Sequence, residues 1–279
     1  MEYLTLYNGV KIPQLGFGVF QIPEYTKAKK AVLSALKVGY RLIDTAQAYG
    51  NEQAVGDAIR ESGIPREEIF ITSKIWISVF SFERAQDATR RSLERLGTDY
   101  IDLMLLHQPM GDYIGAWRGL EKLYNEGTVK AIGMANCYPH VLVDLCETFQ
   151  IRPMLNQVEM HPFFQQEKNL ETMKKYDVTP EAWAPFNEGK RNFFHDPILT
   201  EIGEKYHKTA AQVALRWNLQ RGVVVIPKTV HEDRMRQNFE VFDFTLSEED
   251  MEKIRGMDIG HSEIVDHFDP EWIKMLHSM

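Results

Sequence analysis

The chain has 279 residues, of which 44% are hydrophobic and 26% are charged, a composition typical of a globular protein with a sizeable core. Its net charge of −8 argues against nucleic acid as the main partner, because phosphate backbones bind a basic surface. The N-terminus lacks the basic and apolar regions of a signal peptide, and no apolar run reaches the roughly 20 residues of a membrane span. We therefore expect a cytoplasmic protein that binds neither nucleic acid nor a membrane.

The first 14 residues predict a β-hairpin, because Asn8-Gly9 is a favoured hairpin turn between two short β-type stretches. After the hairpin, short apolar runs alternate with helical patterns along the chain. Ser81 is typical of a residue that begins a helix, and Thr209 with Gln212 predicts a capping box. The eight apolar runs are Gly16–Phe20, Arg41–Asp44, Ile69–Lys74, Ile101–His107, Val129–Ala135, Met154–Glu159, Val178–Ala184 and Val223–Ile226.

Near-continuous apolar strands, each followed by a helix, predict parallel strands that are covered by helices. Eight such units in 279 residues fit a closed barrel better than a doubly wound sheet. No Gly-x-Gly-x-x-Gly motif follows a strand, since Gly16-Phe-Gly18 continues as Val-Phe-Gln. We therefore predict one α/β domain over residues 1–279, a (β/α)8 TIM barrel whose bottom is closed by the hairpin of residues 1–14.

Three segments fall outside the simple alternation of strands and helices. Two of them are helical patterns, around Pro197–Tyr206 and Ser247–Met257. The third is the tail, residues 261–279, which shows no clear period. Phe268 and Trp272 in this tail either lie over the barrel mouth or cap its side.

The chain has two cysteines, Cys137 and Cys146, which the pattern places at the two ends of one helix. At ~1.5 Å per residue they lie about 13 Å apart, which is too far for a disulfide. Both are therefore expected to be free thiols, as fits a reducing compartment, and to pack as small apolar side chains; the alternative is a redox role for Cys137, which follows a strand end.

Polar residues stand at the ends of the predicted strands, where the functional face of such a barrel lies. Asp44, Lys74 and His107 each close an apolar run, and Tyr49 follows Asp44 by five residues. Taken singly, these residues are explained equally well as helix caps, solvated strand ends or a structural histidine. Together they predict a proton-transfer site. An isolated phenol has a pKa near ~10, and an ammonium group held beside it by a carboxylate favours the phenolate and brings that pKa towards neutrality.

Six motifs, in this order and spacing, resemble those of the aldo-keto reductase family over essentially the whole chain. They are Asp44-Thr-Ala-Gln-Ala-Tyr49-Gly-Asn-Glu, Thr72-Ser-Lys74, Leu105-Leu-His107-Gln-Pro, Ala131-Ile-Gly-Met-Ala-Asn136, Asn156-Gln157-Val-Glu-Met-His-Pro and Val225-Ile-Pro-Lys228-Thr. The short loops resemble those of bacterial members related to diketo-gluconate reductases. The resemblance implies NADPH-dependent reduction of aldehydes or ketones to alcohols by hydride transfer, with Tyr49 as general acid. It also implies that Lys74, paired with Asp44, makes Tyr49 more acidic and that His107 orients the carbonyl group.

For the cofactor, the resemblance implies that Asn136 and Gln157 bind the nicotinamide carboxamide, since each side chain offers a donor and an acceptor. It implies that Trp183, where a tyrosine is common, stacks on the nicotinamide ring; the alternative is a tryptophan of the core. Residues around the start of a helix resemble the clamp for the 2′-phosphate, and the alternative for them is an ordinary basic helix face. These residues are Lys228, Thr229, Arg234, Gln237 and Asn238.

Two departures from the family pattern affect cofactor contacts. Ala135 replaces a common serine in the carboxamide pocket, and Ala184-Pro-Phe186 replaces a common Ser-Pro-Leu near the pyrophosphate. Aromatic residues near the strand ends are candidates for the walls of the substrate pocket, and each is otherwise a core residue. In order of preference they are Phe20 and Trp76, which adjoin the ends of strands that carry the predicted proton-transfer residues, and then Phe80 and Trp272.

The residues leave two other functions open: an NADP(H)-binding regulatory or sensor protein with slow turnover, and a phosphosugar isomerase on the same barrel. The isomerase is disfavoured because it has no use for a lysine-paired tyrosine. Useful turnover of simple aldehydes separates an enzyme from a sensor. We expect a small-molecule carbonyl substrate and no metal, because the nine histidines show no paired ligand spacing with a third partner. We also expect a monomer, since no exposed apolar stripe is left unassigned.

Overall fold

The computed structural model describes all 279 residues and contains eight parallel strands in one sheet, each paired with the strands next to it along the chain. Each strand overlaps one of the eight predicted runs. The strands are β3 (Phe17–Gly18), β4 (Leu42–Asp44), β5 (Phe70–Ile75), β6 (Leu103–Leu106), β7 (Ile132–Ala135), β8 (Leu155–Glu159), β9 (Thr179–Trp183) and β10 (Val224–Val225).

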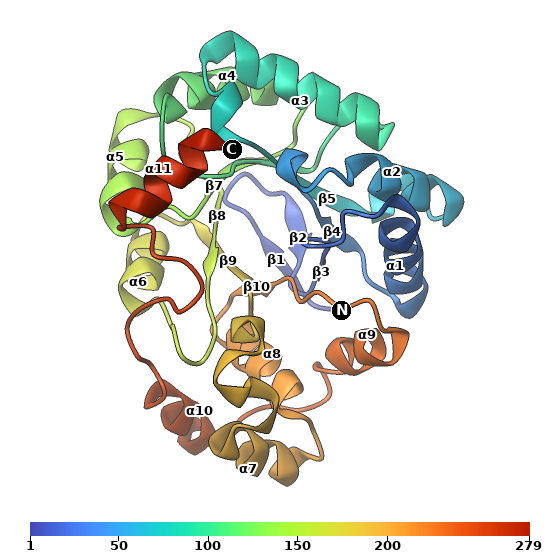
Figure 1. Cartoon of the computed structure of the whole chain (residues 1–279), viewed down its shortest axis with the longest axis vertical. Coiled ribbons are helices and arrows are strands. Elements are labelled where there is room, and N and C mark those ends of the chain that lie inside the picture. The colour runs from blue at the N-terminus through green and yellow to red at the C-terminus, as the bar shows by residue number, and fades with distance from the viewer.

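The sheet closes on itself just before β3 begins. Leu15 forms a parallel bridge with Val225 of β10, and Gly16 N donates to Val225 O at 2.8 Å. Val225 N in turn donates to Gln14 O at 2.9 Å. These bonds join the first strand to the last, and the structure is therefore the predicted (β/α)8 barrel (Figure 1).

Helices surround the barrel and cover the outer face of the strands (Figure 1). Their predicted caps are present: the Ser81 hydroxyl accepts from Arg84 N in the first turn of α3, and Thr209 with Gln212 forms the capping box at the start of α8. None of the helices has both the length and the apolar composition that a bilayer crossing requires. The helices are α1 (Tyr25–Val38), α2 (Glu52–Glu61), α3 (Phe82–Leu96), α4 (Tyr113–Asn125), α5 (Pro139–Thr148), α6 (Glu167–Lys175), α7 (Pro197–Tyr206), α8 (Ala210–Gln220), α9 (Glu232–Phe239), α10 (Glu248–Arg255) and α11 (Pro270–Ser278).

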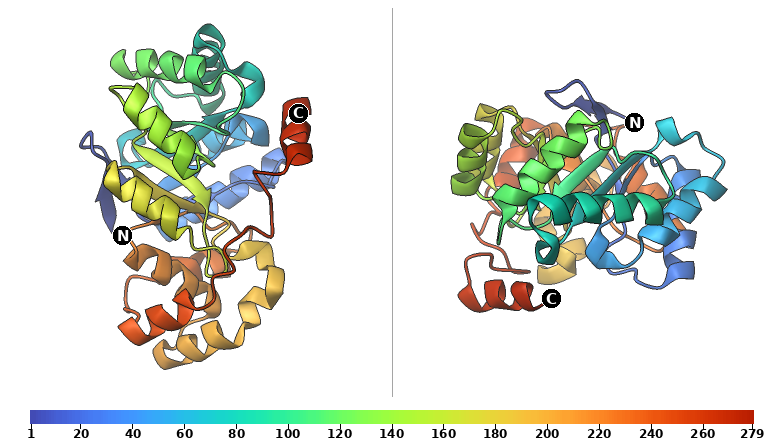
Figure 2. Two further views of the ribbon diagram at one scale, coloured as in Figure 1. Left: turned by 90° about the vertical axis from the view of Figure 1, so that its left-hand side faces the viewer. Right: turned by 90° about the horizontal axis from the view of Figure 1, so that it is seen from above.

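The N-terminal hairpin forms as predicted, from β1 (Tyr3–Thr5) and β2 (Lys11–Pro13) in antiparallel pairing. Gly9 in its turn has a φ of 90°, which a residue with a side chain rarely adopts. The Asn8 amide donates to Lys130 O at 3.0 Å, just before β7 begins. The hairpin therefore lies across the amino-terminal ends of the strands, at the opposite end of the barrel from α11 (Figure 2).

The two extra helices, α7 and α10, form where the sequence predicts them, but the tail differs from the expectation. Its last residues form α11, which begins with Asp269 accepting from Glu271 N at 3.0 Å and Pro270 in the first turn. Only Leu276 of this helix is buried. An apolar stripe this thin shows no period in the sequence, which explains why the helix was not predicted.

Both cysteines are free thiols, as expected. Cys137 is buried before α5, and Cys146 lies half-buried near the end of the same helix. Burial raises the pKa of the Cys137 thiol well above its ordinary value and that of Cys146 to about 11. Neither residue is therefore a thiolate at neutral pH.

Gly133 lies within β7 where the chain passes close to β8. A Cβ atom added there would lie 2.4 Å from Leu155 O and 2.7 Å from Leu105 Cδ2. Gly133→Ala therefore forces apart two strands that carry predicted site residues. We expect it to lower the free energy of unfolding by about 1–3 kcal/mol, measured by urea denaturation. Gly256→Ala is the control, because its new Cβ would have no contact shorter than 3.4 Å. Equal losses in the two variants would contradict the prediction.

Candidate active site

A buried ion pair lies at the carboxyl-terminal end of the barrel. Lys74 Nζ of β5 lies 2.7 Å and 2.8 Å from the two carboxylate oxygens of Asp44, the last residue of β4. The lysine is 0% exposed and the aspartate 2% exposed. Lys74 Nζ also donates to Thr45 O at 3.0 Å, and the Gln157 amide donates to Asp44 Oδ2 at 2.9 Å. These extra bonds offset part of the cost of removing both charges from water.

Tyr49 joins this pair from the short 3-10 turn that follows β4, η1 (Gln47–Tyr49). Lys74 Nζ lies 3.2 Å from the Tyr49 hydroxyl oxygen and donates to it. Residues distant in sequence hold this turn, because the Asn51 amide accepts from Thr45 Oγ1 at 2.7 Å and donates to Val19 O at 2.9 Å. Asn51 was not predicted from the sequence, where it is one polar residue in a loop.

Burial has the largest effect on the phenol. It raises the pKa of Tyr49 above its ordinary value, and the positive charge of Lys74 opposes this rise without cancelling it. Lys74 lowers this pKa, as expected, but the phenol does not approach neutrality in the resting protein, because a buried phenolate lacks the water that would solvate it. Burial also lowers the pKa of Lys74, but Asp44 and Tyr49 outweigh it and leave that pKa above its ordinary value. At neutral pH the site holds a protonated phenol beside an ammonium ion.

His107 follows β6 and faces the same cluster. Its ring centre lies 5.6 Å from that of Tyr49 and 5.0 Å from that of Trp76, both in edge contacts. Burial, and then the charge of Lys74, lower the pKa of His107 well below its ordinary value. The imidazole is therefore neutral at pH 7, with one nitrogen that donates and one that accepts.

Asn136 and Trp183 form a second hydrogen-bonded unit at the same strand ends. Asn136, directly after β7, has a φ of 57°, a left-handed conformation that asparagine tolerates. Its amide donates to His107 O at 3.1 Å and accepts from Trp183 Nε1 at 2.9 Å. Asn136 and Gln157, which were predicted to bind the nicotinamide carboxamide together, therefore have different partners in the protein. Asn136 bonds to Trp183, and Gln157 bonds to Asp44.

The predicted phosphate-binding residues lie in the segment after β10 and in α9. Lys228 and Arg234 are exposed and neither forms an ion pair, whereas Arg236 on the same helix pairs with Glu232. The Thr229 hydroxyl accepts from His231 N at 3.2 Å at the start of α9. The remaining members, three and four positions after Arg234 on one helix face, are Gln237 and Asn238.

Two of the four aromatic candidates flank the cluster of Lys74, Tyr49 and His107. The Phe20 ring is 49% exposed and lies 4.9 Å from the ring of Tyr49, while Trp76 packs on His107. Phe80 is buried within the hydrophobic core, and Trp272 of α11 is half-buried against that core. The structure therefore brings Phe20 and Trp76 to the cluster and gives Phe80 a packing role.

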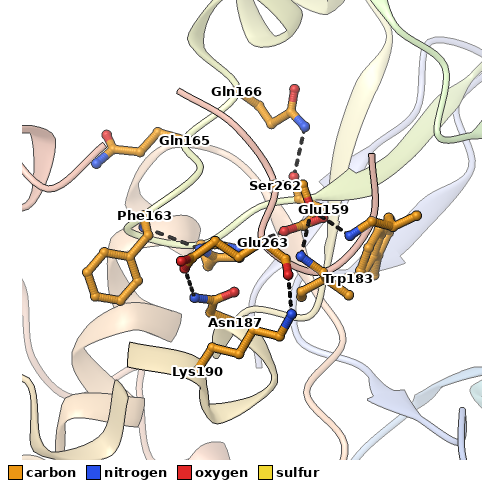
Figure 3. Close-up of polar contacts among 12 residues, drawn as sticks. Glu159, Phe163, Gln165, Gln166, Trp183, Asn187, Lys190, Ser262 and Glu263 are labelled. Atoms are coloured by element: carbon orange, nitrogen blue, oxygen red, sulfur yellow. Dashed lines mark hydrogen bonds and ion pairs between the residues drawn. The ribbon is translucent and has the colours of Figure 1, made fainter. Parts of the chain in front are cut away.

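The tail is bound to the barrel mouth through Ser262 and Glu263 (Figure 3). The Ser262 hydroxyl donates to Glu159 Oε2, at the end of β8, at 2.5 Å. Glu263 accepts from the Asn187 amide at 3.0 Å and, through its backbone oxygen, from Lys190, both in the loop after β9. Sequence reasoning did not find these contacts, because they join side chains more than 70 positions apart.

Glu181 in β9 is a further titratable group that sequence reasoning did not single out. It is 0% exposed, and neither of its carboxyl oxygens has a hydrogen-bond partner in the protein. Burial, and then the negative charge of Asp44, raise the pKa of Glu181 to about 8, with Lys74 opposing. An acidic residue inside an apolar run, two positions before Trp183, is the signal that the sequence offered.

A sequence model described as the aldo/keto reductase family matches residues 14–259. The chain belongs to the aldo/keto reductase family. It is 46% identical over 257 residues to the glyoxal reductase of Bacillus subtilis, covering 92% of each chain. A solved structure proposed to be 2,5-diketo-D-gluconic acid reductase B has a TM-score of 0.92 and 38% identity over 98% of both chains. An aldo-keto reductase of Bombyx mori in complex with NADP has a TM-score of 0.91 and 30% identity over 95% of both chains. The predicted family resemblance is confirmed, and the chain is an oxidoreductase of that family.

The buried ion pair of this aldo/keto reductase gives a direct stability test. Lys74→Met leaves the Asp44 carboxylate buried without its cation, and we expect the free energy of unfolding to fall by about 3–5 kcal/mol in urea denaturation. Asp44→Asn combined with Lys74→Met removes both charges and should recover part of this loss. The control is Lys29→Met, which breaks a surface pair with Glu61 and should change the free energy of unfolding far less. A double variant less stable than Lys74→Met would contradict the prediction.

Proposed function

We propose that the protein reduces aldehydes or ketones to alcohols with NADPH and that Tyr49 is the general acid. The observation that carries this proposal is the 3.2 Å hydrogen bond from the buried Lys74 ammonium to the Tyr49 hydroxyl, with the neutral His107 ring beside it. Family membership and the similarity to a glyoxal reductase support a carbonyl substrate.

NADPH, when bound, supplies a hydride to the carbonyl carbon, and the negative charge then grows on the carbonyl oxygen. His107 donates a hydrogen bond to that oxygen, and Tyr49 gives it a proton. An alkoxide is a much stronger base than a phenolate, so a phenol whose pKa is raised by burial still transfers its proton. Lys74 stabilises the phenolate that forms, and Asp44 holds Lys74 in place. A proton from solvent then restores Tyr49.

The residues of this chain fit a dinucleotide that carries a 2′-phosphate. Lys228 and Arg234 are two cations without carboxylate partners, which suits a dianion. Gly18 lets β3 pass close to the chain just after β10, because a Cβ atom at position 18 would lie 2.9 Å from Ile226 O. The Trp183 indole, held by Asn136, offers a flat surface for the nicotinamide ring. Because Ala135 has no hydroxyl group, Asn136 and Gln157 remain as the side chains that bind the nicotinamide carboxamide.

The proposed substrate is a small carbonyl compound that enters between Phe20 and Trp76, whose rings flank Tyr49 and His107. We also propose that the chain works as one domain and as a monomer in the cytoplasm. The complete set of four acid–base residues favours an enzyme over a sensor with slow turnover. No observation favours a phosphosugar isomerase.

Tyr49→Phe removes the proposed proton donor and keeps the ring. We expect kcat for aldehyde reduction to fall by at least ~100-fold, because general acid catalysis contributes roughly 10²–10⁴-fold. The dissociation constant for NADPH, measured by fluorescence titration, should hardly change. Tyr25→Phe is the control, since it removes a hydroxyl that bonds to Asp57 on the surface. If Tyr49→Phe keeps more than about a tenth of the wild-type kcat, another residue is the donor.

Arg234→Ala removes one of the two cations proposed to bind the 2′-phosphate. Hydrogen bonds to charged groups contribute ~1.5–3 kcal/mol, so we expect NADPH binding to weaken by roughly ten- to a hundredfold. NADH has no such phosphate, and its dissociation constant should stay unchanged. The control is Arg236→Ala on the same helix, whose guanidinium already pairs with Glu232. Equal weakening of NADPH and NADH binding would show that Arg234 has a structural role.

A further inference from the structure

The barrel interior contains one carboxyl group that the proposed acid–base set does not use, that of Glu181. In β9 it lies in register with Gln157 of β8, and residues in register on parallel strands point to the same face of a sheet. The Gln157 side chain reaches Asp44, so it points into the barrel. Glu181 therefore points into the barrel as well, below Trp183, which is two residues further along the strand.

Two charged groups on other strands act on Glu181: Asp44 of β4 and Lys74 of β5. Its neighbours in register are neutral, Gln157 on β8 and Val224 on β10. The charges of Asp44 and Lys74 cancel. An ionised Glu181 would leave this interior with one excess negative charge next to the Tyr49 phenol.

We propose that Glu181 is a positioning residue that is kept neutral so that Lys74 can stabilise the Tyr49 phenolate, and that its ionisation weakens Tyr49 as an acid. Two observations carry this inference: the complete burial of Glu181 and the lack of any close hydrogen bond or cation at its oxygens, since the Gln157 amide, the one donor that lowers its pKa, is bonded to Asp44. A carboxylate in that position would have no water and only the Gln157 amide as a donor, so the protonated form is favoured. The link to Tyr49 rests on the proposed function, whereas the protonation of Glu181 does not.

The consequence for the reaction follows from the charge. Reduction turns Tyr49 into a phenolate, and a negative charge on Glu181 raises the pKa of Tyr49 and so opposes this step. Burial and Asp44 place the pKa of Glu181 at about 8, so the wild-type kcat for reduction should fall as the pH rises through that value. Glu181→Gln keeps the shape and stays neutral, and its kcat should hold to a pH at least about one unit higher.

The ionisation of Glu181 can be tested without any activity. Its carboxyl pKa is about 4.5 in an unfolded chain and about 8 in the folded protein, so between these values the folded state binds more protons. Wild-type stability relative to Glu181→Gln therefore falls as the pH rises from about 4.5 to 8 and is level outside that window. The ratio of the two unfolding equilibrium constants, from urea denaturation, should change by up to about tenfold per pH unit.

The matched control is Glu52→Gln. Glu52 is another buried carboxylate, but it lies on the outer side of β5 and bonds to Arg95 and Ser73. Replacing Glu52 should lower the stability, but the loss should not show the fall with rising pH expected for Glu181. The pH dependence of kcat should stay as in the wild type. If Glu181→Gln does not fold, infrared spectra of the wild-type protein replace it: a protonated-carboxyl band should disappear as the pH rises through about 8.

The two measurements separate the possible failures. A pH-dependent stability ratio together with a shifted kcat profile supports the proposal. A level stability ratio between pH 5 and 8, or no infrared band, would show that Glu181 is ionised throughout and would overturn it. A pH-dependent ratio with an unmoved kcat profile would overturn the link to Tyr49. Failure of the proposed function shows elsewhere, in a Tyr49→Phe variant that remains active.

Discussion

Two opposite charges, those of Asp44 and Lys74, lie 2.7 Å apart inside the barrel, and the chemistry of the interior depends on them. Removing both from water is costly, so the barrel surrounds them with hydrogen bonds from Gln157 and to Thr45 O. The pair is neutral as a whole, but its cation faces the neighbouring groups. That cation bonds to the phenol of Tyr49 and helps to keep His107 unprotonated. A strongly polar cluster is thus built from groups whose charges sum to zero.

The strands of this fold were predictable because parallel strands are buried on both faces and appear as apolar runs. The positions of Asp44, Lys74 and His107 were predictable for the same reason, since a polar residue that closes such a run must lie at the barrel mouth. The closure of the barrel was less visible. β10 has only two residues, and the hydrogen bonds of Val225 with Gln14 and Gly16 that complete the sheet leave no pattern in the sequence.

What the sequence did not reveal depends on burial and on contacts between distant segments. The spacing of Tyr49 and Lys74 indicated that they meet, but the direction of the Tyr49 pKa depends on how little water reaches the phenol. In the sequence Glu181 is only one residue of a predicted strand. Its proposed role depends on the charges that other strands place near it, which the sequence does not show. The contact of Glu263 with the loop after β9 joins two segments that have no common motif.

The hairpin and α11 lie at opposite ends of the barrel, which decides how this protein is best attached to a surface (Figure 2). Residues before α11 pack at the mouth, where Phe268 lies 4.8 Å from Tyr138, ring centre to ring centre. A tether at Met279 would therefore add bulk beside the opening proposed for the substrate. A tether at Met1 would turn the opening away from the support and leave α11 free. For immobilised or fused forms of this protein, the amino terminus is the better point of attachment.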